Sequence, residues 1–267
     1  MSTMYAARPP ALPGRAGHSR VDCSHARAIV SPRALGALWL VGLLAGCQIG
    51  PFPPAASPPA QADAPQLAVG DTWIYRHTDG YTKLPRGTFT HIISAIAGDV
   101  VTVQVTAENG SVVASDQFTR DWNWLDKPMT NIQRFRYAPP YRAFQFPLQA
   151  DTGWSVQMKA TDVTAGRTYD LARVDGKVGG WKRVTVPAGT FDAVAVHRSA
   201  YSGVETFVRT QEYIVEEDWY APAVNNVVAA SYRSSYRDKT QNGDMDTGWR
   251  ENDWTRVELV EYRPARK

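Results

Sequence analysis

The chain has 267 residues, 43% of them hydrophobic, so it is long enough to bury a core in one or two domains. It carries 29 basic and 26 acidic side chains, but five arginines and one aspartate lie before Cys47. From Cys47 onward, 24 basic side chains therefore face 25 acidic ones, a formal charge of −1. A nearly neutral body lacks the basic surface that nucleic-acid binding requires, so we expect no nucleic-acid partner.

Residues 34–46 form a thirteen-residue run without a charged side chain, and Arg27 and Arg33 precede it. As a helix the run would be about 20 Å long, too short to cross a hydrocarbon core of ~30 Å. An apolar run of this length behind a positive flank is typical of a signal peptide. The alternative is a short buried helix, but a helix of a soluble domain needs a polar face, and this run has none. We therefore predict a signal peptide over residues 1–46.

The apolar run ends in Leu44, Ala45, Gly46 and Cys47, a sequence that resembles the lipobox of bacterial lipoproteins. The resemblance covers these four residues and the segment before them. It implies that a peptidase recognises Leu44 to Gly46 and cuts before Cys47, after a diacylglycerol has alkylated the thiol. A thiol is the soft nucleophile that thioether formation needs. Cys47 would then be the first residue and the only cysteine of the mature chain, which excludes a disulfide framework.

A signal of 46 residues is longer than the usual ~15–30. Its first part is rich in arginine, alanine and proline and shows no periodicity. We expect the true start of translation to lie downstream, at Val21 or Val30.

Residues 47–66 join the lipidated cysteine to the rest of the chain and contain six prolines, Pro51, Pro53, Pro54, Pro58, Pro59 and Pro65. A proline-rich chain adopts the extended polyproline II conformation at ~3.1 Å per residue, so this segment would reach about 60 Å. The alternative, a ligand for SH3-type domains, lacks a basic residue beside the prolines. We predict a tether that holds a domain away from the membrane.

Residues 67–267 alternate apolar and polar side chains in short runs, as at Val101, Val103 and Val105. Turn dipeptides such as Asn109-Gly110 separate the runs, and no stretch keeps a helical period. The pattern predicts an all-β periplasmic domain of roughly ten antiparallel strands, arranged as a sandwich or a half-open barrel.

A faint internal repeat runs at an offset of 81 residues, with six identities over residues 67–105. The aligned pairs are Leu67 with Leu148, Trp73 with Trp154, Arg86 with Arg167, Gly98 with Gly179, Val103 with Val184 and Val105 with Val186. We interpret it as a duplicated hairpin unit; the alternative is that β-hairpins resemble one another in their glycine and valine positions.

Two segments, VPAGTFDAVAV at 186–196 and DWYAPAVNNVV at 218–228, resemble β-rich envelope proteins of Gram-negative bacteria, many of them lipoproteins without a known function. The resemblance covers mainly residues 147–236. It implies a fold and a location, and it carries no catalytic residues to transfer. Pro187 and Gly189 are expected to form a turn with positive φ at the glycine. Ala223, Asn225 and Asn226 stand where the family has glycines, but asparagine can also adopt positive φ.

Residues that could carry chemistry are sparse. His77, His91 and His197 have no second histidine or acid at metal-ligand spacing, so we expect packed or surface side chains. No nucleophile motif or nucleotide-binding glycine loop occurs. The acidic run at 216–218 is expected to be a solvated strand face. The sequence therefore predicts no catalytic residue, metal site or cofactor.

The most suggestive stretch runs from Arg134 to Phe146 and places three arginines among five aromatic residues. Its candidate ligand-binding residues are Arg134, Arg136, Tyr137, Tyr141 and Arg142. Guanidinium groups beside aromatic rings could hold anionic groups or stack on sugars. The favoured alternative is a connecting segment whose aromatic side chains pack inward.

The leading functional hypothesis is a non-enzymatic, lipid-anchored envelope protein that serves as a binding or assembly module. Its partners would be the membrane, through the N-terminal lipid, and an envelope protein, a glycan or a lipid. Gln48 follows the lipidated cysteine, where an aspartate favours inner-membrane retention in enteric lipoproteins, so the resemblance implies the periplasmic face of the outer membrane. The alternatives are a carrier of a lipid or other apolar ligand in a β cavity and a hydrolase that acts on the cell wall.

Overall fold

The structure, a computed structural model, describes residues 59–129, 133–210, 212–239 and 245–266. These residues form fourteen β-strands and one 3-10 turn, η1 (Pro222–Val224), and contain no α-helix. The strands are β1 (Gln61–Ala62), β2 (Thr72–Asp79), β3 (Pro85–Ala97), β4 (Val100–Ala107), β5 (Val112–Thr119), β6 (Trp124–Pro128), β7 (Arg134–Tyr141), β8 (Leu148–Gln149), β9 (Gly153–Asp162), β10 (Thr168–Val186), β11 (Gly189–Tyr201), β12 (Tyr213–Ala221), β13 (Asn226–Lys239) and β14 (Met245–Arg263). The prediction of an all-β domain is confirmed.

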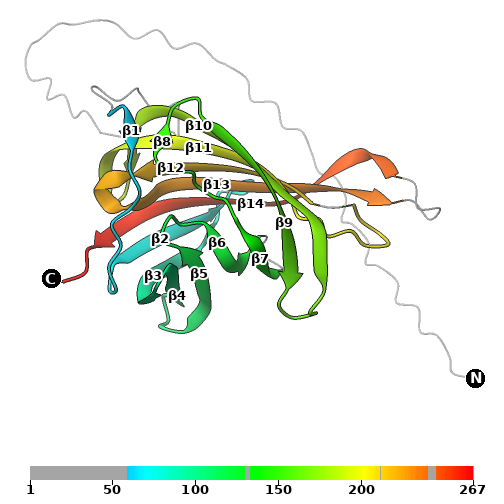
Figure 1. Ribbon diagram of the computed structural model, residues 1–267, viewed down its shortest axis with the longest axis horizontal. Helices are drawn as coiled ribbons and strands as arrows, with labels where there is room; N and C mark the ends of the chain where they lie inside the picture. Colours follow the sequence, from blue (N-terminus) through cyan, green and yellow to red (C-terminus); the bar gives the residue numbers. More distant parts are fainter. Residues whose placement is uncertain (1–58, 130–132, 211, 240–244, 267) are drawn as a thin grey trace, which may run out of the picture. The chain divides into compact units, whose positions relative to one another are not determined.

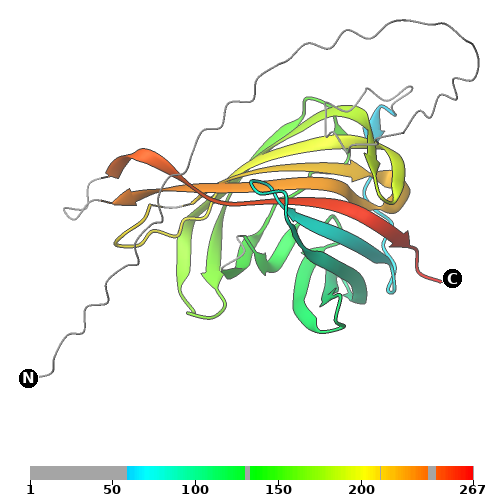
Figure 2. The ribbon, with the colours of Figure 1, turned by 180° about the vertical axis from the view of Figure 1, so that it is seen from behind.

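Twelve of the strands form one closed antiparallel barrel, in the order β10, β11, β12, β13, β14, β2, β3, β4, β5, β6, β7, β9. Strands β10 to β14 lie side by side as one curved layer, and strands β2 to β7 curve beneath them (Figures 1 and 2). The β13–β14 hairpin extends past the other strands at the end away from the C-terminus (Figure 1). Strands β1 and β8 form a separate two-stranded sheet.

The barrel corrects the expectation of a sandwich or half-open barrel of about ten strands. Closure depends on two pairings between strands that are not consecutive in the chain, β14 with β2 and β7 with β9. Alternation of apolar and polar residues is the same in a sandwich and in a barrel, so it does not reveal these pairings. In β7 the alternation of polar and apolar residues lasts only from Arg134 to Tyr137 before two prolines interrupt it.

Local sequence accounts for the two turns of the segments that resemble envelope proteins. Val186 pairs with Gly189, so Pro187 and Ala188 form a two-residue hairpin loop, and Gly189 has φ +135°. Asn225 closes η1 with φ 53°, as expected for an asparagine that replaces a glycine. Both turn predictions are confirmed.

The core lies inside the barrel and is rich in aromatic side chains, with Trp73 and Tyr141 fully buried. The first strand begins within the segment predicted as a tether: β1 pairs with β8, and Ala62 is buried. At the offset of the internal repeat, Gly98 lies in the β3–β4 turn, whereas Gly179 lies within β10. The duplicated hairpin unit stays a prediction.

Candidate functional site

Two adjoining lobes of a cavity lie within the barrel and share His77, Trp124, Lys127 and Tyr232 as lining residues. The inner lobe has a volume of about 130 Å³, and the outer lobe about 210 Å³. The inner lobe reaches the aromatic end of the barrel, which we define by Trp73, Trp122, Phe118 and Tyr262. The outer lobe reaches the polar end, which we define by Asp79, Arg86, Ser234 and Asp253. The cavity thus has walls of different chemistry at its two ends.

Three aromatic side chains fasten the turn that follows β12 to the aromatic end. Trp73 Nε1 donates to the carbonyl oxygen of Val224, and Trp122 Nε1 donates to that of Asn225, both at 2.8 Å. Tyr75 Oη donates to the carbonyl oxygen of Val227, also at 2.8 Å. The indole and phenol groups therefore present their rings to the inner lobe while their polar atoms are hydrogen-bonded, as buried Trp and Tyr require.

A fully buried arginine joins two buried carboxylates beside the cavity. Arg198 Nε donates to Glu216 Oε2 at 2.6 Å, Nη2 donates to Asp218 Oδ2 at 2.7 Å, and Nη1 donates to a backbone carbonyl between β7 and β8 at 3.0 Å. Tyr141 Oη donates to Glu216 at 2.7 Å, and Tyr232 Oη donates to Asp218 at 2.9 Å. Burial alone would lower the pKa of Arg198, but the charges of Asp218 and Glu216 raise it well above its usual value. The arginine is therefore charged at every physiological pH.

The other charged residues that line the two lobes are paired as well. Their ion pairs are Lys127 with Asp116 at 3.8 Å, Arg233 with Glu251 at 2.7 Å and Asp253 with Arg86 at 2.6 Å. The Lys127 ammonium also lies 5.1 Å from the ring centroid of Trp124. Each charge that faces the cavity thus has an opposite charge close by.

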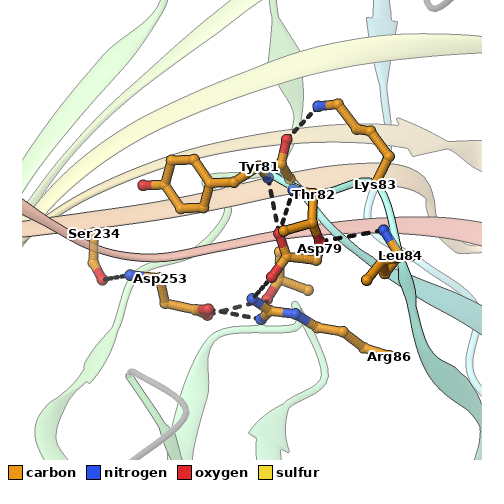
Figure 3. Close-up of polar contacts among 10 residues, drawn as sticks. Asp79, Tyr81, Thr82, Lys83, Leu84, Arg86, Ser234 and Asp253 are labelled. Carbon is orange, nitrogen blue, oxygen red and sulfur yellow. Dashed lines mark hydrogen bonds and ion pairs between the residues drawn. The ribbon is translucent and has the colours of Figure 1, made fainter. Parts of the chain in front are cut away.

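The polar end is built around the β2–β3 turn (Figure 3). Asp79 accepts hydrogen bonds from the backbone N–H groups of Tyr81 at 2.9 Å and Thr82 at 2.8 Å, and it pairs with Arg86 (Figure 3). Arg86 reaches on to Asp253 of β14. The Thr82 N–H and the Arg86 guanidinium hold the pKa of Asp79 well below its usual range. This turn is therefore held by hydrogen bonds and charge pairs rather than by buried apolar area.

Two histidines line the inner lobe in their neutral form. Burial, followed by the charge of Lys127, lowers the pKa of His77 to about 4 and that of His91 to about 3. His91 packs edge-on against Tyr75, and its Nε2 is buried without a hydrogen-bond partner. The imidazole of His91 therefore keeps one buried nitrogen without a hydrogen bond.

The folded chain brings together groups that the sequence shows far apart, and this bears on enzyme chemistry. Glu216 and Asp218 meet at Arg198, and His77 and His91 line one lobe. Both carboxylates are bound to the arginine and to a tyrosine. A histidine with a pKa of about 3 or 4 is a weak base at neutral pH. The described residues contain no cluster of His, Cys, Asp or Glu that could hold a metal ion.

The expectation of a solvated acidic face at residues 216–218 is wrong. Glu216 and Asp218 are 2% and 3% exposed and point into the barrel, whereas Glu217 is half-buried and accepts a hydrogen bond from Trp219 Nε1 at 2.8 Å. Side chains alternate along β12, so residues two apart share a face. The buried Ile214 on the same face was the signal in the sequence that could have placed both acids inside.

The residues of the predicted ligand surface do not share one face. Arg134 is half-buried, with Nη1 2.8 Å from Asp116 and Nε 2.5 Å from Asp126. Arg136 and Arg142 are exposed, whereas Tyr137 and Tyr141 are buried inside the barrel. A ligand role for this stretch stays a prediction.

The predicted lipidation site, Leu44, Ala45, Gly46 and Cys47, lies outside the described residues. So does the predicted signal peptide and the tether up to residue 58. In the described part of the chain, no helix has the length and hydropathy that a membrane span needs.

Three solved structures show distant likenesses to this chain. No family model matches the chain, and no curated protein matches it. A protein of Parabacteroides distasonis named as a lipoprotein is 16% identical, with 77% of this chain and 100% of that chain covered at a TM-score of 0.39. A protein of Bacteroides fragilis with a YmcC-like fold is 12% identical over 76% and 99%, at a TM-score of 0.37. The hypothetical lipoprotein YmcC of Escherichia coli is 10% identical over 73% and 86%, at a TM-score of 0.40. Likenesses at these TM-scores do not establish a shared function.

Proposed function

We propose that this chain is a non-enzymatic, lipid-anchored envelope protein whose β-barrel is a binding module. The observation that carries the binding role is the two-lobed cavity inside the closed barrel. A cavity with mostly aromatic walls and a few oriented polar groups is the usual form of a small-molecule site.

The anchor follows from the cysteine that closes the apolar run. Cys47 stands directly after residues 34–46, and a proline-rich segment separates it from the first strand at Gln61. One myristoyl-sized chain gives only marginal membrane binding, and each buried methylene adds ~0.8 kcal/mol. A cysteine that carries two or three chains would be held firmly. Gln48 after it favours the periplasmic face of the outer membrane.

Binding is a better use of the cavity than catalysis. The carboxylates of Glu216 and Asp218 are both hydrogen-bonded to Arg198, and the neutral His77 and His91 have pKa values well below neutrality. A general acid or base works best with a pKa near the working pH. These groups are suited to shaping and orienting a ligand, and we therefore rank a hydrolase last.

A carrier of a lipid or other apolar ligand is the second candidate, because the cavity has aromatic walls. The lobes have aromatic walls, yet their volumes of about 130 and 210 Å³ reach only the lower end of the ~300–1,000 Å³ that drug-sized ligands occupy. A diacyl lipid is much larger than this space. The cavity therefore supports a small ligand rather than a whole membrane lipid.

The anchor is tested by replacing its cysteine. Cys47→Ala should abolish palmitate labelling and release the protein from the membrane fraction, because no thiol remains to be alkylated. Cys23→Ala is the matched control, since it removes the chain's other cysteine and should leave labelling unchanged. An unchanged membrane fraction for Cys47→Ala would refute the anchor.

A further inference from the structure

The charged residues that line the cavity do not cancel one another. Among the described residues, three carboxylates and two cations line the lobes: Glu216, Asp218, Asp253, Lys127 and Arg233. Both cations are paired with acids that line neither lobe, Lys127 with Asp116 at 3.8 Å and Arg233 with Glu251 at 2.7 Å. The three carboxylates of the walls therefore depend on other groups for a positive partner.

Those positive partners are fewer than the carboxylates that they serve. Glu216 of the outer lobe and Asp218 of the inner lobe share the single guanidinium of Arg198. Asp253 shares the single guanidinium of Arg86 with a second aspartate, at the end of β2 (Figure 3). Each set has one carboxylate more than it has cations, so the walls are net negative. A wall of this kind attracts a positively charged ligand, and in a site of low dielectric the attraction is strong.

One oxygen of Glu216 is available inside the cavity. Its Oε2 accepts hydrogen bonds from Arg198 Nε at 2.6 Å and from Tyr141 Oη at 2.7 Å. Its Oε1 accepts none from the described residues, and it is not sealed off from open space, as a buried atom without a partner would be. Because the side chain is only 2% exposed and lines the outer lobe, that open space is the cavity. A carboxylate oxygen forms its strongest hydrogen bonds with charged donors.

The inner lobe provides space for an apolar group beside this oxygen. An engineered apolar cavity of ~150 Å³ in another protein holds a benzene molecule. The inner lobe is close to this size, at about 130 Å³, and the rings of Trp73, Trp122 and Phe118 line it. Glu216 and Asp218 line different lobes but bind the same arginine, so Glu216 lies close to the junction of the two lobes. A ring in the inner lobe could therefore carry a charged substituent to Glu216.

We propose that the cavity binds a small organic amine in its protonated form, with the ammonium group donating a hydrogen bond to Glu216 Oε1 and a ring-sized apolar body in the inner lobe. The inference rests on the proposed binding function and names the class of its ligand. Glu216 and the excess of carboxylates compensate the ammonium group for its lost hydration. The aromatic walls hold the apolar body.

Four probes with the same ring separate these requirements. Benzylamine is a cation at pH 7.5, benzyl alcohol has a hydroxyl and no charge, toluene has neither, and benzoate is an anion. The protein is purified as cells produce it and, where it carries lipid, placed in phosphatidylcholine nanodiscs. Equilibrium dialysis measures binding, with empty nanodiscs as the blank. Benzylamine should bind about tenfold more tightly than benzyl alcohol, because a hydrogen bond between charged groups is stronger than one with a neutral donor. Toluene and benzoate should bind more weakly than the alcohol.

The contact with Glu216 is tested by a variant and by a spectroscopic measurement. Glu216→Gln keeps the shape of the side chain but removes its charge, so benzylamine should lose its advantage over benzyl alcohol. Glu217→Gln is the matched control, because it removes the same charge from the opposite face of β12, where the side chain is 43% exposed and lines neither lobe. This variant should keep the preference for the amine. If Glu216→Gln does not fold, the carboxyl ¹³C resonance of Glu216 in the unmodified protein should shift with benzylamine and stay in place with toluene.

The outcomes distinguish the ligand class from the binding function. If benzyl alcohol, toluene or benzoate binds as tightly as benzylamine, the amine class is overturned, while binding in the barrel survives. A preference for the amine that persists in Glu216→Gln, or an unmoved Glu216 resonance, overturns the contact with Glu216. If none of the four probes binds, the cavity-binding function fails as well, and the anchor stands or falls separately on Cys47→Ala.

Discussion

The two ends of the barrel use the same strands but are stabilised in different ways. At the aromatic end, Trp73 of β2 is fully buried, stacks on Tyr262 of β14 with ring centroids 5.6 Å apart, and donates to a backbone carbonyl. At the polar end of the same two strands, Asp79 and Asp253 are joined by Arg86, whose side chain is 30% exposed. Salt does not screen the stabilisation that buried apolar area gives the aromatic end. The exposed ion pairs of the polar end contribute little free energy, and salt screens them.

This difference indicates how the cavity could serve a ligand. The aromatic end is fixed by packing and hydrogen bonds, so it would provide the rigid part of the site. The polar end is held by pairs that open at a small cost in free energy, so it would provide the entrance. The predictions below test this contrast, beginning with the aromatic end, where the largest effect is expected.

Trp73→Ala should give the largest loss of stability. It removes a fully buried ring, a hydrogen bond to Val224 and the contacts with Trp122 and Tyr262. Truncation of a buried aromatic residue costs about 3–5 kcal/mol in free energy of unfolding. Denaturant titration followed by circular dichroism measures it.

Trp249→Ala is the control for that truncation. Trp249 has the same side chain but is 52% exposed, so the free energy of unfolding should change much less. Equal losses for the two variants would show that the aromatic end contributes no special stability.

The sequence revealed the local features of this fold. Alternating valines and turn residues predicted an all-β chain, and the turns at Gly189 and Asn225 were predicted from the φ values that glycine and asparagine allow. Closure of the barrel could not be predicted, because the pairing of Thr255 with Asp79 joins strands far apart in the chain. No local pattern encodes such a partner.

The candidate site was harder to predict than the fold. Arg198, Glu216 and Asp218 are charged residues, which are expected to be exposed unless they are paired. Their pairing spans β11 and β12 and becomes visible only when the register of these strands is known. His77 and His91 also lack any signature in sequence, because their neutral state arises from burial and from the charge of Lys127.

A pH titration tests how far the buried aromatic part extends towards the polar end. In the unfolded chain, histidines take up protons below about pH 6.5, whereas folded His77 and His91 stay neutral down to about pH 4 and 3. The unfolded state therefore binds more protons in this window. The free energy of unfolding should fall as the pH drops from 6.5 towards 4, by at most ~1.4 kcal/mol per pH unit for each histidine. The loss should level off once the folded imidazoles protonate.

The contribution of the two histidines to the pH dependence of stability is obtained by comparing the unmodified protein with variants. Carboxylates also titrate at acidic pH, so the profile is compared with that of a His77→Phe, His91→Phe double variant, in which the slope between pH 6.5 and 4 should be smaller. His197→Phe, on an exposed side chain, should keep the original slope. An unchanged slope in the double variant would mean that water from the polar end reaches both imidazoles.

Arg86→Gln at the polar end should have the smallest effect on stability, because exposed ion pairs contribute about 0–1 kcal/mol. Its local effect is clearer. Without the guanidinium, the pKa of Asp79 should rise towards the usual value, while the N–H groups of Thr82 and Tyr81 still hold it partly down.

Arg263→Gln, at the aromatic end of β14, removes an exposed pair with Glu261 and should leave the titration of Asp79 unchanged. NMR titration of the Asp79 carboxyl measures the change in its pKa, and amide exchange at the β2–β3 turn measures how readily the turn opens. A global loss of stability as large as that of Trp73→Ala would mean that the polar end is part of the rigid frame, so the entrance would have to lie elsewhere.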